Sequence, residues 1–144
     1  MRKELIKSLL SALIIATFLL SCDSKPQQSF ETVTFQNPIL PGFYPDPSVC
    51  KGPDGYYMVN STFSYFPGIP IFYSPDLVHW EQIGNVMSRP EQLQLDGLGI
   101  STDGIYAPTI EYNNGKFYVA CTVVRGKGNY IVTADDPAGP WSDP

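Results

Sequence analysis

The 144-residue chain has a single histidine, His79, and three cysteines, Cys22, Cys50 and Cys121. Protein zinc sites gather three or four His, Cys or carboxylate ligands at short, characteristic spacings, and no group of these residues has such a spacing. The sequence therefore predicts no metal site. Cys50 and Cys121 each lie in an apolar stretch, so two buried free thiols are at least as good an interpretation as a disulfide formed in an oxidising compartment.

Positive charge is also scarce. The sequence has nine Lys and Arg against 14 Asp and Glu, and from Cys22 onward six against 13, which gives a net charge of −7. Proteins that bind nucleic acid need clustered Lys and Arg to neutralise phosphates, and no such cluster is present. Nucleic acid is thus excluded as the expected partner, and the acidic balance suits an exported, soluble domain.

The sequence has no hydrophobic run of comfortable membrane-spanning length. Residues 8–20 have the length of a signal-peptide core and follow a basic start. Leu-Leu-Ser-Cys at 19–22 resembles a bacterial lipobox, in which the peptide is cut before the cysteine and the cysteine is lipidated. We predict a lipoprotein signal peptide over 1–21, lipidation of Cys22 and a polar tether over 22–34. The product would be exported and anchored to a membrane, on its periplasmic or cell-surface face. An ordinary secretory peptide is the alternative.

Helical periodicity is absent after the tether, and short strand-like runs between turn signals take its place. These runs repeat in the same order after 60 or 61 residues. The matched positions are Gly55 and Gly115, Tyr57 and Phe117, Val59 and Val119, Asp76 and Asp136, Trp80 and Trp141, and the segments 46–49 (DPSV) and 107–110 (APTI). Four short strands per unit predict an all-β fold built of propeller blades.

Two blades alone would leave strand edges and inner faces open to water. A ring of four to eight such units needs at least about 240 residues. Only 123 residues follow the predicted signal peptide. We therefore expect the N-terminal fragment of a larger propeller, with about the first two blades present.

Several motifs carry a resemblance to a known family: NPILPGFYPDPSV at 37–49, YYMVNSTFSYFPGIPIFYSPDLVHW at 56–80, GIYAPTI at 104–110 and GPWSDP at 139–144. Together they are similar to the opening of a family 43 glycoside hydrolase, in its β-xylosidase and α-L-arabinofuranosidase branch. The resemblance covers residues 35–144 and implies a five-bladed β-propeller with its active site in a central funnel. The implied activity is hydrolysis of O-glycosyl bonds of xylan or arabinoxylan, or of their oligosaccharides, with inversion.

The resemblance also implies roles for particular residues. Asp46, in Pro-Asp-Pro-Ser, matches the general base, and its flanking prolines would stiffen the strand entry that aims it. Phe63 resembles an apolar wall of the sugar pocket, and Asn129 matches a position near it. Tyr106 lies 60 residues after Asp46, so we expect it at the same strand tip in the second blade, where the family often has Trp. Tyr65 and Phe66 would extend the wall, although blade core is the alternative for every aromatic residue.

In the family, an Asp that tunes the general acid and the acid Glu itself come from later blades. Glu81, Glu91 and Glu111 do not match either position, and His79 lies in a motif whose role looks structural. We therefore expect the 144-residue chain alone to be inactive. No cofactor is expected, although some family members hold a calcium ion through residues outside this segment.

Other functions are compatible with the sequence. An arabinan- or galactan-acting enzyme of the same family is one, and pocket residues from later blades would decide it. A non-catalytic, surface-anchored propeller that binds glycans is another, but binding alone would not require a carboxylate at position 46. A related clan of retaining enzymes uses an Asn-Asp-Pro-Asn-Gly motif, which Pro45-Asp46-Pro47-Ser48 does not match.

Overall fold

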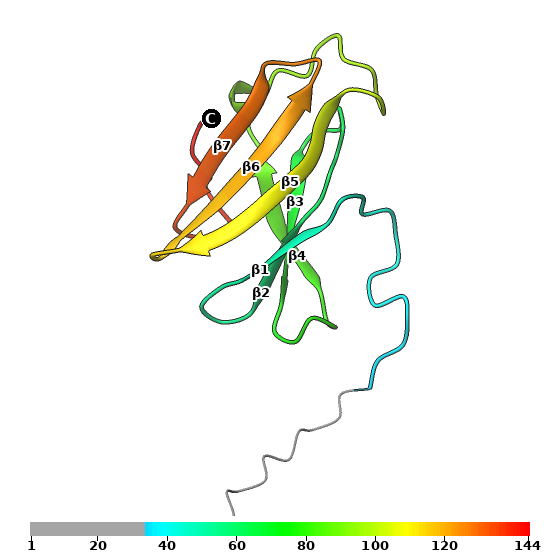
Figure 1. Ribbon diagram of the computed structural model, residues 1–144, viewed down its shortest axis with the longest axis vertical. Coiled ribbons are helices and arrows are strands. Elements are labelled where there is room, and N and C mark those ends of the chain that lie inside the picture. Colours follow the sequence, from blue (N-terminus) through cyan, green and yellow to red (C-terminus); the bar gives the residue numbers. More distant parts are fainter. Residues whose placement is uncertain (1–33) are drawn as a thin grey trace, which may run out of the picture. The chain divides into compact units, whose positions relative to one another are not determined.

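The computed structural model describes residues 34–144 (Figure 1). Residues Phe35–Pro144 form one compact unit with seven strands and one short 3₁₀ turn. The predicted signal peptide, the lipidated Cys22 and all of the tether except Thr34 lie outside the described residues.

The first sheet contains four antiparallel strands in the order β1-β2-β3-β4. The strands follow one another in a simple meander. The first turn is closed by the Gly52 N–H, which donates to the Gly55 carbonyl at 2.9 Å. The strands are β1 (Ser48–Lys51), β2 (Tyr56–Val59), β3 (Gly68–Ser74) and β4 (Glu81–Met87).

The second sheet has three antiparallel strands in the order β5-β6-β7. A short 3₁₀ turn, η1 (Pro90–Gln92), lies on the connection from the first sheet. Asn114 (φ 50°) and Gly115 (φ 82°) form a tight two-residue hairpin, which requires positive φ at both positions. The strands are β5 (Gly104–Asn113), β6 (Lys116–Val124) and β7 (Gly128–Ala134).

The predicted repeat is confirmed in strand order and at the outer turns. The Trp80 indole N–H donates to the Leu77 carbonyl at 3.1 Å, and the Trp141 indole N–H donates to the Pro137 carbonyl at 3.2 Å. The offset is not uniform, however. Because β5 has a register shift between Tyr106 and Thr109, its later residues lie 62 positions after their counterparts in β1.

The two sheets pack face to face around one apolar core (Figure 1). The Tyr57 and Phe117 rings meet edge to face, with centroids 4.7 Å apart. The inner strands β1 and β5 are tied by Ser48, whose hydroxyl accepts from the Ile110 N–H at 3.2 Å. The core residues exposed by 1% or less are Val59, Ile69, Ile71, Val86, Met87, Ile105, Phe117, Val119, Val123 and Val132.

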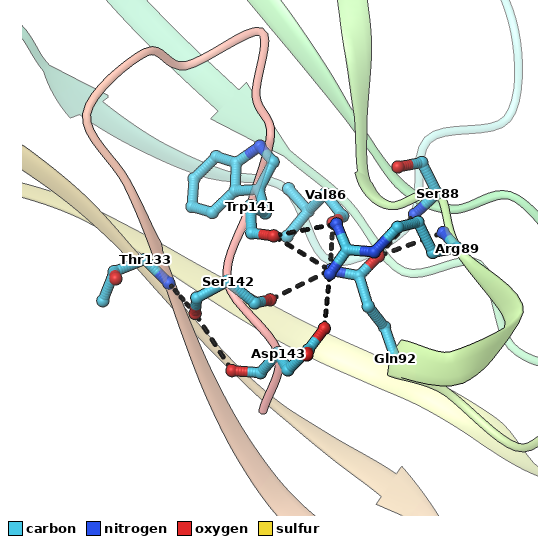
Figure 2. Close-up of polar contacts among 8 residues, drawn as sticks. All are labelled: Val86, Ser88, Arg89, Gln92, Thr133, Trp141, Ser142 and Asp143. Carbon is cyan, nitrogen blue, oxygen red and sulfur yellow. Dashed lines mark hydrogen bonds and ion pairs between the residues drawn. The ribbon is translucent and has the colours of Figure 1, made fainter.

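A polar cluster joins the two sheets at the C-terminal segment (Figure 2). The buried Gln92 amide donates to the Ser142 carbonyl at 2.9 Å and accepts from the Ser88 and Arg89 N–H groups at 3.0 Å. Arg89 donates to the Trp141 carbonyl at 3.0 Å and pairs with Asp143. The Ser142 N–H donates to the Thr133 carbonyl of β7 at 2.9 Å, so this segment lies along the second sheet as β4 lies along the first.

Both cysteines of the described unit are free thiols. Cys121 is buried and Cys50 half-buried. Loss of hydration raises the pKa of each thiol to about 11, with the nearby Glu111 adding to the effect on Cys50. Over residues 34–144 there is no helix long and apolar enough to cross a membrane, and no cluster of metal-ligating side chains.

Candidate active site

Asp46 lies two residues before β1, and its side chain is open to solvent. Its backbone is in the left-handed region (φ 52°), which is uncommon for a residue other than glycine. One carboxylate oxygen, Oδ2, accepts a hydrogen bond of 2.6 Å from the Ser61 hydroxyl. The site therefore presents an exposed acid that is held at one of its two oxygens.

Ser61 belongs to the loop between β2 and β3 and is only 2% exposed. Its N–H donates to the Pro45 carbonyl at 3.0 Å, so backbone and side chain both hold the segment that carries Asp46. The same hydroxyl accepts from the Ala107 N–H of β5 at 2.7 Å. A single side chain thus connects the candidate base to the second sheet.

Ala107, and not Tyr106, is the counterpart of Asp46 in the second repeat. Ala107 also has a positive φ (41°), and Pro108 follows it as Pro47 follows Asp46. The prediction that Tyr106 shares the strand tip of Asp46 was therefore wrong by one residue. The offset of 61 between the segments 46–49 and 107–110 holds at this position.

Tyr106 nevertheless lies beside Phe63, as an aromatic wall would require. The two rings meet edge to face with centroids 5.0 Å apart, and Phe43 stacks on Phe63 with centroids 6.4 Å apart. The Tyr106 hydroxyl donates to the Ser101 carbonyl at 3.3 Å. Phe43 was not predicted, although it lies within the family motif at 37–49.

Backbone pairing between the two sheets fixes Phe63, which has a positive φ of 52°. Its N–H donates to the Ile105 carbonyl at 3.0 Å, and the Ile105 N–H donates back at 2.8 Å. A Cβ at Gly104 would collide with the Phe63 carbonyl, and Gly104 has a φ of 93°, so only glycine fits there. The pairing explains why the wall residue comes from a loop but is still rigidly placed.

The other predicted pocket residues lie further apart. Tyr65, 59% exposed, borders a hollow of about 250 Å³ together with Phe43, Ser61 and Phe63. Phe66 borders a different hollow, beside Pro90 and Leu93. Asn129 accepts from the Thr122 hydroxyl at 2.8 Å and shares a third hollow with Ala107. Ser61, Phe63 and Tyr65 thus line one hollow and Tyr106 packs on Phe63, whereas Phe66 and Asn129 border other hollows.

His79 takes part in the outer turn that follows β3. Its backbone N–H donates to Asp76 Oδ1 at 2.8 Å, and its ring Nδ1 lies 2.7 Å from Asp76 Oδ2. These bonds, with a third from the Val78 N–H, hold the pKa of the Asp76 carboxyl well below its usual range. The histidine therefore orders a surface turn, as its motif suggested.

The sheets and the site together define a class: a β-propeller segment with an exposed, anchored carboxylate just before its first inner strand and an aromatic pair, Phe63 and Tyr106, where the two sheets meet. The model of the glycosyl hydrolases family 43 matches residues 35–144. The chain belongs to this family, whose solved members are five-bladed β-propellers.

Relatives agree with this assignment. The chain is 55% identical over 114 residues to a non-reducing end alpha-L-arabinofuranosidase of Bacteroides ovatus, covering 77% of this chain and 22% of that protein. It is 58% identical over 112 residues to a xylosidase/arabinosidase of Butyrivibrio fibrisolvens, covering 78% and 21%. A solved structure, the Bacteroides ovatus xyloglucan PUL GH43B, superposes with a TM-score of 0.73 at 55% identity, over 76% of this chain and 22% of that one. The chain thus spans about a fifth of the length of the relatives it matches.

Proposed function

We propose that this segment supplies the general base of an inverting glycoside hydrolase that acts on xylan, arabinoxylan or their oligosaccharides. The observation that carries the proposal is the Asp46 carboxylate, which is exposed to solvent yet anchored at Oδ2 by the buried Ser61 hydroxyl. A general base must lie within hydrogen-bond reach of the proton that it removes, and small displacements are costly. The hydrogen bond from Ser61 limits the displacement of the Asp46 carboxylate, and it leaves Oδ1 to meet a water molecule.

In the proposed step, Asp46 removes a proton from a water molecule on one face of the sugar. The water oxygen forms a bond to the anomeric carbon while the bond to the leaving oxygen breaks, and a second carboxyl protonates that oxygen. Inverting enzymes keep the two carboxyls about 6.5–9.5 Å apart to leave room for the water. In our proposal the second carboxyl lies outside residues 34–144.

The aromatic residues support a sugar as the substrate. Phe63, two residues after Ser61, packs edge to face on Tyr106, and aromatic rings pack well on the C–H faces of sugars while a tyrosine hydroxyl supplies a polar contact. The names of the relatives favour pentose units at a non-reducing end. An arabinan- or galactan-acting enzyme and a non-catalytic glycan-binding propeller are the competing functions.

A chimera provides the test. Residues 35–144 would replace the matching segment of the Bacteroides ovatus relative, with which they share 55% identity. We expect release of p-nitrophenol from an aryl arabinofuranoside or xyloside, and we expect Asp46→Asn to lower kcat by about 10²-fold or more while the melting temperature is retained. The natural protein would be assayed in parallel.

The outcomes separate the alternatives. Near-normal turnover by the Asp46→Asn variant would show that Asp46 is not the base. A folded, inactive chimera that still binds xylo-oligosaccharide would favour the glycan-binding function. The 144-residue chain alone is expected to release no p-nitrophenol, and activity there would contradict our placement of the acid.

We also propose that the protein is an exported lipoprotein held to a membrane through Cys22. The support is the sequence itself: a basic start, a short apolar core and Leu-Leu-Ser-Cys at 19–22. Metabolic labelling with a palmitate analogue in a bacterial host tests it. Label is expected on the natural sequence and absent from Cys22→Ser, whereas cleaved, unlabelled protein would favour an ordinary secretory peptide.

A further inference from the structure

We propose that Ser61 is a positioning residue for Asp46. Its hydroxyl group links the Asp46 carboxylate to the backbone of the second sheet and so fixes the carboxylate relative to that sheet. This inference rests on the proposed function, in which Asp46 is the general base. The hydroxyl lies 2.6 Å from Asp46 Oδ2 and 2.7 Å from the Ala107 nitrogen. Within residues 34–144, the Ser61 hydroxyl is the side-chain group that forms a hydrogen bond with the Asp46 carboxylate.

The direction of both hydrogen bonds follows from the chemistry of the groups. A backbone N–H can only donate, so the Ala107 N–H must point at a lone pair of the Ser61 oxygen. The single hydroxyl proton of Ser61 is then directed at Asp46, whose ionised carboxylate can only accept. Such a bond from a hydroxyl to an ionised carboxylate belongs to the stronger class of protein hydrogen bonds.

The positions of the two residues make this contact important for Asp46. Asp46 is exposed, so packing does little to fix its side chain, whereas Ser61 is 2% exposed and cannot move away. Because Ser61 holds Oδ2, Oδ1 is the oxygen that faces the attacking water molecule and receives the proton of that water. Ser61 has no second proton to give, which makes it a positioning group and not a participant in proton transfer.

The second repeat shows what the same hydroxyl does where no acid is present. Thr122, 61 residues after Ser61, pairs with Tyr106 in the β5–β6 ladder, as Ser61 bonds to the backbone of Pro45. Its hydroxyl donates at 2.8 Å to the side chain of Asn129, its cross-strand partner on β7. The blade thus places a hydroxyl here in both repeats, and only in the first does it meet a carboxylate.

The test is a double-mutant cycle in the active chimera or natural enzyme, with variants Ser61→Ala, Asp46→Asn and the pair. We expect Ser61→Ala to lower kcat about 10- to 100-fold with KM changed less than about threefold. In the Asp46→Asn background, the same change should have almost no further effect, because its only route is through Asp46. Ser61→Thr, which keeps the hydroxyl, should recover part of the lost turnover.

Ser64→Ala is the matched control. Ser64 lies in the same loop, and its hydroxyl donates to the Gly99 carbonyl at 2.8 Å without touching Asp46, so kcat should stay within about threefold of the parent. Equal losses in Ser61→Ala and Ser64→Ala, or additive losses in the cycle, would overturn the proposal by showing a general effect on the loop. Full activity in Ser61→Ala alongside an inactive Asp46→Asn would also overturn it, while leaving the proposed function intact. Only an active Asp46→Asn variant would contradict the function itself.

Discussion

The backbones at Asp46, before β1, and at Ala107, inside β5, share one bend, but the two residues differ in chemistry. Both residues have a positive φ, 52° and 41°, and both are followed by proline. If a left-handed residue before proline occurred only at Asp46, this backbone conformation would suggest a role in catalysis. Its recurrence at an alanine shows that this bend belongs to the blade, and that the carboxylate is what the first blade adds.

The comparison also shows that the site depends on both blades. The second blade places no carboxylate at this point and instead supplies the Ala107 N–H, which orients the Ser61 hydroxyl. It also supplies Ile105, which pairs with Phe63, and Tyr106, which packs against it. The candidate base therefore depends on the backbone of the second blade as well as on its own loop.

The largest expected difference between the repeats lies at their tryptophans. Trp141 is 3% exposed, whereas Trp80 is only partly buried, although both indoles cap an equivalent turn. We expect Trp141→Ala to lower the free energy of unfolding by about 3–5 kcal/mol, as for other large-to-small core substitutions. Trp80→Ala should cost less than half as much, because it removes less buried apolar area.

Urea unfolding of the two variants in the full chain measures the difference, with the m-value checked for two-state behaviour. Similar losses in both variants would mean that the tryptophans act mainly through their turns. The difference in burial between Trp141 and Trp80 would then not determine how much each side chain contributes to the free energy of unfolding.

A smaller effect is expected at the left-handed alanine. A left-handed conformation costs an L-residue roughly 1–2 kcal/mol, and glycine avoids this cost but loses more entropy on folding. Ala107→Gly should therefore change stability by less than about 1 kcal/mol, in the stabilising direction. Ala120→Gly, on β6 where the backbone pairs with Thr109 and Ile131, should destabilise by about 0.5–1 kcal/mol.

Thermal unfolding of the two glycine variants is the measurement. A loss at position 107 as large as that at position 120 would show that Ala107 is not strained. The bend would then no longer stand out as a costly feature shared by the two blades.

Much of the fold could be predicted from local sequence signals. Turn glycines such as Gly55 and Gly115 and the recurring Asp-to-Trp spacing are local features, so the strand order and the two units could be predicted. The register shift after Ala107 could not, because one added residue inside a strand leaves no mark in an apolar pattern. This is why the later residues of β5 lie 62 positions after their counterparts in β1 and not 61, as the sequence predicted.

The site was predictable to the extent that single motifs define it. Asp46, Phe63 and Tyr106 lie in family motifs, and the structure bonds Asp46 to Ser61 and packs Phe63 on Tyr106. Ser61 also lies in such a motif, but its role depends on the Ala107 N–H, 46 residues away. A hydroxyl placed by tertiary contacts has no signature in sequence, whereas the offset of 61 could have identified Ala107.

The smallest expected effect, and the one most dependent on pH, lies at the outer turns. Asp76 accepts from the Val78 and His79 N–H groups and contacts the His79 ring, whereas Asp136 accepts from the Ala138 N–H. Hydrogen bonds, first from the His79 backbone and then from its ring, lower the pKa of Asp76 in the folded state. A lowered folded pKa stabilises the protein above the unfolded value of about 3.9, and this contribution is lost as the pH falls through the folded pKa.

Asp76→Asn should therefore lower the melting temperature at pH 7, by more than Asp136→Asn does, and its deficit should shrink steadily below about pH 4. A deficit that stays constant down to about pH 2 would show that the turn depends on the shape of the side chain and not on its charge.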